Sequence, residues 1–149
     1  MKRIWFAILF LGTAIISNAQ PFANDIAAFK KQDAVAMPPK NAILFVGSSS
    51  FTKWKDVQEY FPKHVILNRG FGGSTLPDVI RYEKDIIFPY QPRQIVIYCG
   101  ENDVASSDTV TAAMVLQRFK QLFTDIRQQY PKTPVAFISL KPCPSRWQM

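Results

Sequence analysis

The sequence contains few of the side chains from which proteins build metal sites and disulfide frameworks. Its 149 residues include one histidine, His64, and two cysteines, Cys99 and Cys143. These three residues do not have the spacing of a zinc site, and Glu101 and Asp108 have no histidine or second acidic cluster to support them. We therefore expect no metal ion, and we expect a buried free thiol at Cys99 rather than a bond to Cys143.

The sequence also lacks a run of like charges. Its 18 Lys and Arg residues outnumber its 11 Asp and Glu residues, but the basic residues are scattered along the chain. Proteins that bind nucleic acid or anionic lipid usually gather such charges in one patch. We therefore assign the net charge of +7 to a solvated surface and expect no nucleic-acid partner.

One long apolar run, residues 4–16, follows Lys2 and Arg3 and is followed by a segment of small residues that ends at Ala19. This arrangement is typical of a secretory signal peptide. The run is shorter than the roughly 20 residues that a membrane-spanning helix needs. We predict that residues 1–19 are a signal peptide, and that the rest is one domain of a secreted or periplasmic protein without a stable membrane anchor.

Residues 42–46 form a continuous apolar run, which predicts a strand buried on both faces. The run stops at Gly47 and the three serines Ser48, Ser49 and Ser50. Serine is a preferred residue at a helix start, where free N–H groups also favour negative charge. These residues alone leave three alternatives: an N-cap, a catalytic serine or a phosphate-binding turn.

Strands and helices alternate along the rest of the chain, as apolar runs and amphipathic stretches indicate. Such alternation is typical of an α/β fold with three layers, α/β/α, around a parallel sheet. The apolar positions of the helices are expected to be core residues. The expected strands span residues 65–68, 94–99 and 135–140. The expected helices span residues 21–37, 51–61, 76–88 and 109–130, the last capped by Ser107 or Asp108; expected core positions include Trp54, Val57, Phe61, Val115, Leu116, Phe119, Leu122, Phe123 and Ile126.

Three of the expected strands end in polar turns, at residues 47–50, 70–75 and 100–103. The carboxyl ends of parallel strands lie at one edge of a sheet, and ligands bind in the crevice beyond them. A hydroxyl nucleophile there needs N–H donors that hold the oxyanion formed on its substrate. Gly73 can offer an unobstructed backbone N–H, and Asn102 can offer a side-chain NH2.

The three turns resemble the sequence blocks of the SGNH hydrolases, which are also called GDSL esterases and lipases. Gly47-Ser48-Ser49 corresponds to the Gly-Asp-Ser block of that family. Residues 68–73, Asn-Arg-Gly-Phe-Gly-Gly, correspond to its Asn-x-Gly-x-x-Gly block, and residues 100–103, Gly-Glu-Asn-Asp, to its Gly-x-Asn-Asp block. The resemblance covers about residues 42–140, which is most of the chain after the expected signal peptide.

This resemblance implies a flavodoxin-like fold and a serine esterase that needs no metal or organic cofactor. Its small-molecule substrates would be acyl esters, such as acetylated carbohydrates or lipid-type esters. The resemblance also implies that Ser49 is the nucleophile. The oxyanion hole would consist of the N–H of Ser49, the N–H of Gly73 and the side chain of Asn102.

Two features depart from the family pattern. Ser48 stands where the family usually has Asp, and the Asp-x-x-His block that supplies the general base does not occur before Met149. We therefore interpret residues 20–149 as the N-terminal portion of an SGNH domain, inactive as it stands. His64 precedes a strand and should lie about 13 Å or more from the crevice, too far to replace the base. Asp103 lies close to a helix start and is expected to be structural.

A second hypothesis is that the chain is complete and forms a non-catalytic module that binds carbohydrate or ester. Such a module would retain the crevice without the catalytic histidine. Nucleotide binding has less support, because Thr75 stands where a dinucleotide-binding loop needs its third glycine. If the sheet is truncated, its apolar edge is uncovered, and we expect poor solubility.

Overall fold

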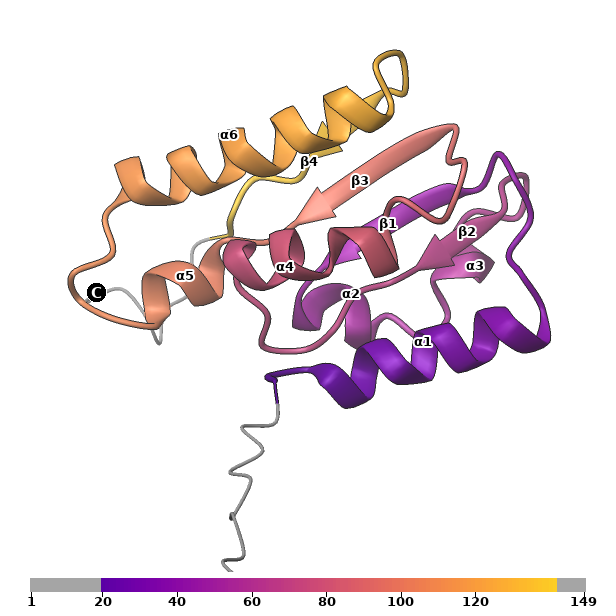
Figure 1. Cartoon of the computed structure of the whole chain (residues 1–149), viewed down its shortest axis with the longest axis horizontal. Coiled ribbons are helices and arrows are strands. Elements are labelled where there is room, and N and C mark those ends of the chain that lie inside the picture. The colour runs from indigo at the N-terminus through magenta and orange to yellow at the C-terminus, as the bar shows by residue number, and fades with distance from the viewer. Residues whose placement is uncertain (1–19, 142–149) are drawn as a thin grey trace, which may run out of the picture.

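The computed structural model describes residues 20–141 and confirms the expected α/β fold. Its core is a four-stranded sheet in the order β2-β1-β3-β4, and every pair of neighbouring strands is parallel. Strands β1, β2 and β3 point the same way in Figure 1, toward the side where α2 and α5 begin. The strands are β1 (Ile43–Gly47), β2 (Ile66–Asn68), β3 (Gln94–Tyr98) and β4 (Val135–Phe137).

The central strand β1 pairs with β2 on one side and β3 on the other. Its residue Ile43 is opposite both Ile66 and Gln94, and Gly47 is opposite Tyr98. All five residues of β1 are buried, as expected for an apolar run in a sheet with both faces covered. The serines that follow Gly47 therefore leave the sheet at its centre.

Helices cover the two faces of the sheet unequally. The buried residues of α1, α4 and α6 pack with Leu44, Val46 and the alternating β3 positions in one large cluster. Short helices α2 and α3 cover the other face, around Phe45. The helices are α1 (Ala23–Val35), α2 (Ser49–Lys53), α3 (Val57–Tyr60), α4 (Leu76–Ile86), α5 (Glu101–Ala105) and α6 (Ala112–Gln129).

Helix α4 begins directly after the second polar turn, and its sequence determines this start. Thr75 and Asp78 stand at the two positions of a capping box, and Asp78 Oδ2 accepts from both the N–H and the hydroxyl of Thr75. Pro77 in the first turn needs no intrahelical donor. The interaction between Thr75 and Asp78 thus fixes the start of α4, and with it the end of the second turn.

The structure corrects three expectations about element boundaries. The amphipathic stretch over residues 51–61 is not one helix but the end of α2 and a separate α3, while the start of α2 at Ser49 agrees with the expectation that the serines begin this helix. The long helix does not begin at Ser107 or Asp108, because Thr111 is its N-cap and accepts a hydrogen bond from the N–H of Met114. The last strand ends at Phe137 rather than at residue 140.

Most of the expected core positions are buried or partly buried, but Leu116 on α6 is 53% exposed. The expected signal peptide and Cys143 lie outside the described residues. Within residues 20–141, no helix has the length and apolar character that a membrane crossing requires.

Candidate functional site

The first polar turn begins at a glycine that no other residue could replace. Gly47 has φ +145°, and a Cβ atom placed on it would lie 1.9 Å from the carbonyl oxygen of Tyr98 on β3. A side chain would therefore collide with the backbone of the neighbouring strand. The absence of a Cβ lets β1 run alongside β3 up to the point where the serines begin.

Ser48 anchors the turn and leaves Ser49 available. Ser48 is 1% exposed, its N–H donates to the carbonyl of Tyr98 at 3.1 Å, and its carbonyl accepts from the N–H groups of Phe51 and Thr52. It occupies the N-cap position of α2, but its side chain makes no cap hydrogen bond. Ser49 is the first residue of α2 and is partly exposed. The N-cap alternative thus applies to Ser48 by position, whereas Ser49 has no capping role.

The second polar turn packs against α2. The side chain of Asn68 donates to the carbonyl of Phe51 at 2.7 Å and accepts from the N–H of Gly70 at 3.0 Å. A Cβ atom on Gly70 would lie 2.7 Å from that of Phe51, so only glycine permits this approach. Asn68 therefore links the second turn to the helix that carries Ser49.

Gly72 and Gly73 lie in the part of the second turn that is close to Ser49. A Cβ atom on Gly72 would be 4.0 Å from the Cβ of Ser49, in ordinary contact. Gly73 has φ +89°, which favours glycine, and the ring of Phe22 lies against it. Within residues 20–141, neither the N–H of Ser49 nor that of Gly73 donates a hydrogen bond. Both donors are available to a ligand.

The third polar turn is joined to the second by a side chain. The Nδ2 of Asn102 donates to the carbonyl of Ser74 at 2.9 Å. Since a primary amide has two N–H groups, one remains for a ligand. The predicted placement of the three turns in one region is therefore confirmed by two hydrogen bonds, from the Ser74 hydroxyl to the Gly47 carbonyl and from Asn102 to the Ser74 carbonyl.

Asp103 has a structural role, as expected from the sequence. Its carboxylate is fully buried, accepts a hydrogen bond from the N–H of Leu76 at 2.8 Å and pairs with Arg118 at 2.9 Å. Each of its two oxygens thus has a partner that belongs to the fold, and the buried side chain is held away from Ser49. Asp103 is therefore not a candidate for the base that Ser49 needs.

His64 lies away from the three turns, as the sequence also predicted. It is exposed, it precedes β2, and its Nδ1 lies 2.7 Å from the guanidinium of Arg93. The polar turns follow the opposite, carboxyl ends of the strands. The single histidine of this sequence cannot act on Ser49 from this position.

A buried polar cluster behind the second turn was not predicted. Arg69, 5% exposed, forms an ion pair with Asp33 of α1, and its Nε donates to the hydroxyl of Tyr90 at 2.8 Å. The Tyr90 hydroxyl in turn donates to Asp33, and burial raises the pKa of Tyr90 to about 12. The guanidinium also lies over the ring of Phe29. This cluster ties α1 to the second turn.

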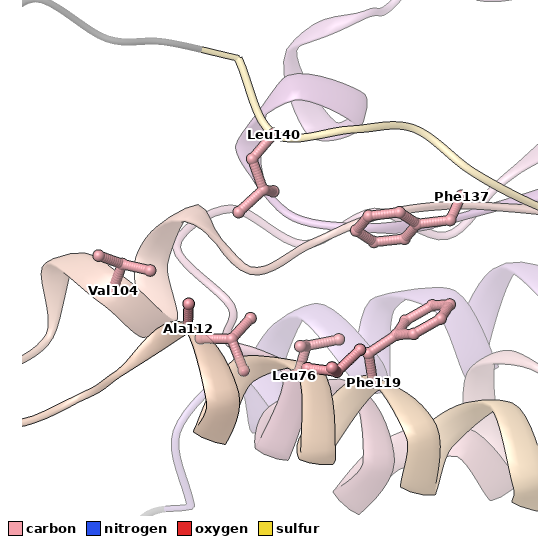
Figure 2. A pocket seen from close by; sticks show the side chains of 8 residues that line it. Leu76, Val104, Ala112, Phe119, Phe137 and Leu140 are labelled. Atoms are coloured by element: carbon pink, nitrogen blue, oxygen red, sulfur yellow. The ribbon is translucent and has the colours of Figure 1, made fainter.

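An apolar cavity of about 250 Å³ lies beside the third turn, between α6 and the β4 segment (Figure 2). The ring centroids of Phe119 and Phe137 lie 4.6 Å apart there, with the ring planes tilted by 53°. A Cβ atom on Gly100 would be 3.4 Å from Leu140, which places the third turn next to this space. Among residues 20–141, the lining side chains are all apolar: Leu76, Val104, Ala112, Val115, Leu116, Phe119, Phe137 and Leu140.

The remaining reactive side chain near the site is Cys99. It is a free, buried thiol that donates to the carbonyl of Ser74 at 3.6 Å. Burial raises the pKa of the thiol well above its usual range, so it is not a nucleophile at neutral pH. In the part of the chain that the structure describes, no three His, Cys, Asp or Glu side chains are grouped closely enough to hold a metal ion.

Comparisons with solved structures find the same fold in several hydrolases. A GDSL-like lipase from Bacteroides thetaiotaomicron superposes with a TM-score of 0.66 at 20% identity, over 83% of this chain and 63% of its own. AlinE4, an SGNH-hydrolase family esterase, gives 0.59 at 18% identity, over 74% of this chain and 64% of its own. The acetyl xylan esterase AlAXEase gives 0.52 at 19% identity, over 64% and 56%.

These likenesses establish the fold, which is that of the SGNH hydrolases. The chain spans about 56–64% of the length of these three structures. No protein-family model and no curated protein matches the sequence.

Proposed function

We propose that this protein, whose fold is that of the SGNH hydrolases, is an exported serine esterase that hydrolyses small acyl esters through Ser49. One observation carries the proposal: Ser49 begins a helix with a free N–H, beside a second turn whose Gly73 N–H is also free. Asn102 adds a third donor from the next strand end. Converging donors beside a hydroxyl are what acyl transfer requires.

The reaction would proceed in two steps. The Oγ of Ser49 attacks the ester carbonyl while a general base takes its proton, and the N–H groups of Ser49, Gly73 and Asn102 hold the oxyanion. The alcohol leaves with that proton, and an acyl-enzyme remains on Ser49. Water then attacks the acyl-enzyme, which releases the acid and restores the serine.

Neither His64 nor Asp103 can be the general base for Ser49. His64 is remote from Ser49, and Asp103 is bound to Leu76 and Arg118. We propose that an Asp-x-x-His block of the kind that SGNH hydrolases carry supplies it in the whole protein. Sequencing of the coding DNA beyond the codon for Met149 tests this part, since the block must follow in frame.

For the substrate, we propose an acetyl or short acyl ester of a carbohydrate or lipid. The fold is shared with an acetyl xylan esterase and with a GDSL-like lipase, and these two proteins suggest the range of ester substrates to be tested. Rates with acetylated xylan fragments and with p-nitrophenyl esters of increasing acyl length would separate the two ends of that range. A preference for acetylated xylan fragments would favour the carbohydrate ester.

A non-catalytic binding module is the second candidate, and the remote position of His64 favours it. Such a module would bind an ester or carbohydrate in the same crevice and leave it intact. It would predict saturable binding of acetylated oligosaccharides, measured by calorimetry, without release of acetate.

The decisive experiment uses the full-length protein with p-nitrophenyl acetate and a fluorophosphonate probe. We expect turnover and covalent labelling of the wild type, and loss of both in Ser49→Ala. Ser107→Ala is the matched control, because Ser107 is exposed and, within residues 20–141, its hydroxyl forms hydrogen bonds with Thr109 alone. A correctly folded full-length protein without turnover or labelling would exclude the esterase and leave the binding module.

A further inference from the structure

We propose that Ser74, which no sequence block singles out, is a positioning residue that orients Asn102 and locks the three polar turns together. The proposal rests on the esterase function given above. Ser74 does not touch the reacting atoms, so its effect must pass through its neighbours. The evidence is its full burial and its contacts with both other turns.

The hydroxyl of Ser74 binds the first turn. Its Oγ donates to the carbonyl of Gly47 at 3.3 Å, and Gly47 is two residues before Ser49. The N–H of Phe71 donates to the same carbonyl at 2.9 Å. Two donors from the second turn therefore hold the last carbonyl of β1, which fixes the second turn relative to the nucleophile.

The carbonyl of Ser74 binds the third turn. It accepts from Asn102 Nδ2 at 2.9 Å and from the thiol of Cys99 at 3.6 Å. A carbonyl attracts the NH2 end of an amide and repels its oxygen, so this contact decides which way the Asn102 amide is turned. The second N–H of Asn102 is thereby left for the oxyanion.

The two contacts form one connected unit. Gly73, the donor of the second turn, precedes Ser74 directly, so a shift of Ser74 moves the Gly73 N–H and the Asn102 amide together. The oxyanion donors act mainly in the transition state, and loss of one such donor typically lowers kcat about 10²–10³-fold. We expect that partial misplacement through Ser74 lowers kcat about tenfold, with little change in KM.

The test compares Ser74→Ala, Ser74→Cys and Ser107→Ala in the full-length protein. Ser74→Ala removes the hydrogen bond and leaves a small gap, whereas Ser74→Cys fills the gap with a weak donor. We expect kcat to stay low in both Ser74 variants, with KM and the Ser107→Ala control unchanged. Because a thiol is a much weaker donor than a hydroxyl, full recovery of kcat in Ser74→Cys would show that filling the space is sufficient and would overturn the proposal.

A double-mutant cycle with Asn102→Ala distinguishes positioning from general damage. If Ser74 acts in part through Asn102, Ser74→Ala should lower kcat less in the Asn102→Ala background than in the wild type, and the loss that remains there is the part that passes through the Gly73 N–H. Fully additive losses, or a Ser74→Ala variant with wild-type kcat, would overturn the proposal. An inactive wild type that the fluorophosphonate does not label would overturn the esterase function itself, which is a different result.

Nuclear magnetic resonance of the Asn102 side-chain amide gives a readout that does not depend on turnover. We expect Ser74→Ala to shift this NH2 signal and to speed its hydrogen exchange, since the Ser74 carbonyl would be held less firmly. An Asn102 signal unchanged by Ser74→Ala would contradict the proposal. If Ser74→Ala does not fold, the same measurement on Ser74→Cys decides.

Discussion

Asp103 Oδ2 accepts a hydrogen bond from the backbone N–H of Leu76 at 2.8 Å, which fastens the third polar turn to the first residue of α4. The other carboxylate oxygen of Asp103 pairs with Arg118 on α6. One buried side chain thus connects a turn of the site with two helices that cover the sheet. Its removal should affect folding as well as the site.

Asp103→Ala is expected to destabilise the fold by about 3 kcal/mol, because it leaves the N–H of Leu76 and the Arg118 charge without their partner. Chemical denaturation followed by circular dichroism measures this loss. Asp56→Ala is the control, since Asp56 is exposed and its side chain makes no cap hydrogen bond. Equal stability of the two variants would contradict the role given to Asp103.

Gly47→Ala is expected to prevent folding or to cost more than about 4 kcal/mol, because its Cβ would lie 1.9 Å from the Tyr98 carbonyl oxygen. Gly72→Ala is the matched control. At Gly72 the nearest atoms to a new Cβ are 3.8–4.0 Å away, so the fold should tolerate it. Thermal melts of both variants provide the measurement, and a Gly47→Ala protein with a wild-type melt would refute the close approach of the strands.

Tyr90→Phe is expected to cost about 1–3 kcal/mol, since it removes the acceptor of Arg69 Nε in a buried site. Tyr60→Phe should cost almost nothing, because Tyr60 is 64% exposed. Denaturant titration of the two variants checks the difference. If both lose the same stability, the Arg69 cluster does not hold α1 in the way the contacts indicate.

The stability of the protein should fall as the pH rises from about 4.5 to 7. Burial and the nearby Asp125 raise the pKa of Glu83 from 4.5 to about 7, against the opposing effect of Lys84. In that range the folded state keeps the Glu83 proton while the unfolded chain releases it, so unfolding becomes easier with rising pH. Above about pH 7 the carboxylate is charged in both states, and the effect levels off.

Glu83→Gln should flatten this dependence, because glutamine stays neutral. The expected gain at pH 8 is on the order of 1 kcal/mol, since partial exposure screens the charge. Melting temperatures at pH 5, 6, 7 and 8 measure it, with Glu59→Gln at an exposed site as control. A Glu83→Gln protein with the same pH profile as the wild type would rule out this carboxyl as the cause.

The strand positions could be predicted because the central strands are buried. Residues 42–46 have no polar side chain, and only a strand with both faces covered or a buried helix accommodates such a run. That the turns after these strands lie together then followed from topology alone, because the carboxyl ends of parallel strands lie at one edge of the sheet. That reasoning brought Ser49 and Asn102 into one region before any contact was known.

The contacts that hold the site could not be predicted, because they join residues far apart in sequence or use backbone atoms. Asp33 and Arg69 are 36 residues apart, and no local pattern pairs them. The acceptor for Asn102 is the carbonyl of Ser74, a group that every residue has. The start of α6 was missed because Ser107, Asp108 and Thr111 all suit an N-cap. The structure shows that the Ser107 hydroxyl accepts from the N–H of Thr109 in the preceding turn, whereas Thr111 accepts from the N–H of Met114 and caps the helix.

The packing of Phe22 against the second polar turn has a practical consequence for protein production. Its ring meets that of Phe71 at 5.1 Å, and the carbonyl of Pro21 accepts from the hydroxyl of Tyr82 at 2.6 Å. A purification tag fused directly to Gln20 would therefore emerge beside Gly73, where it could crowd the crevice. Vectors for this protein should place a flexible spacer between the tag and Gln20, or attach the tag elsewhere.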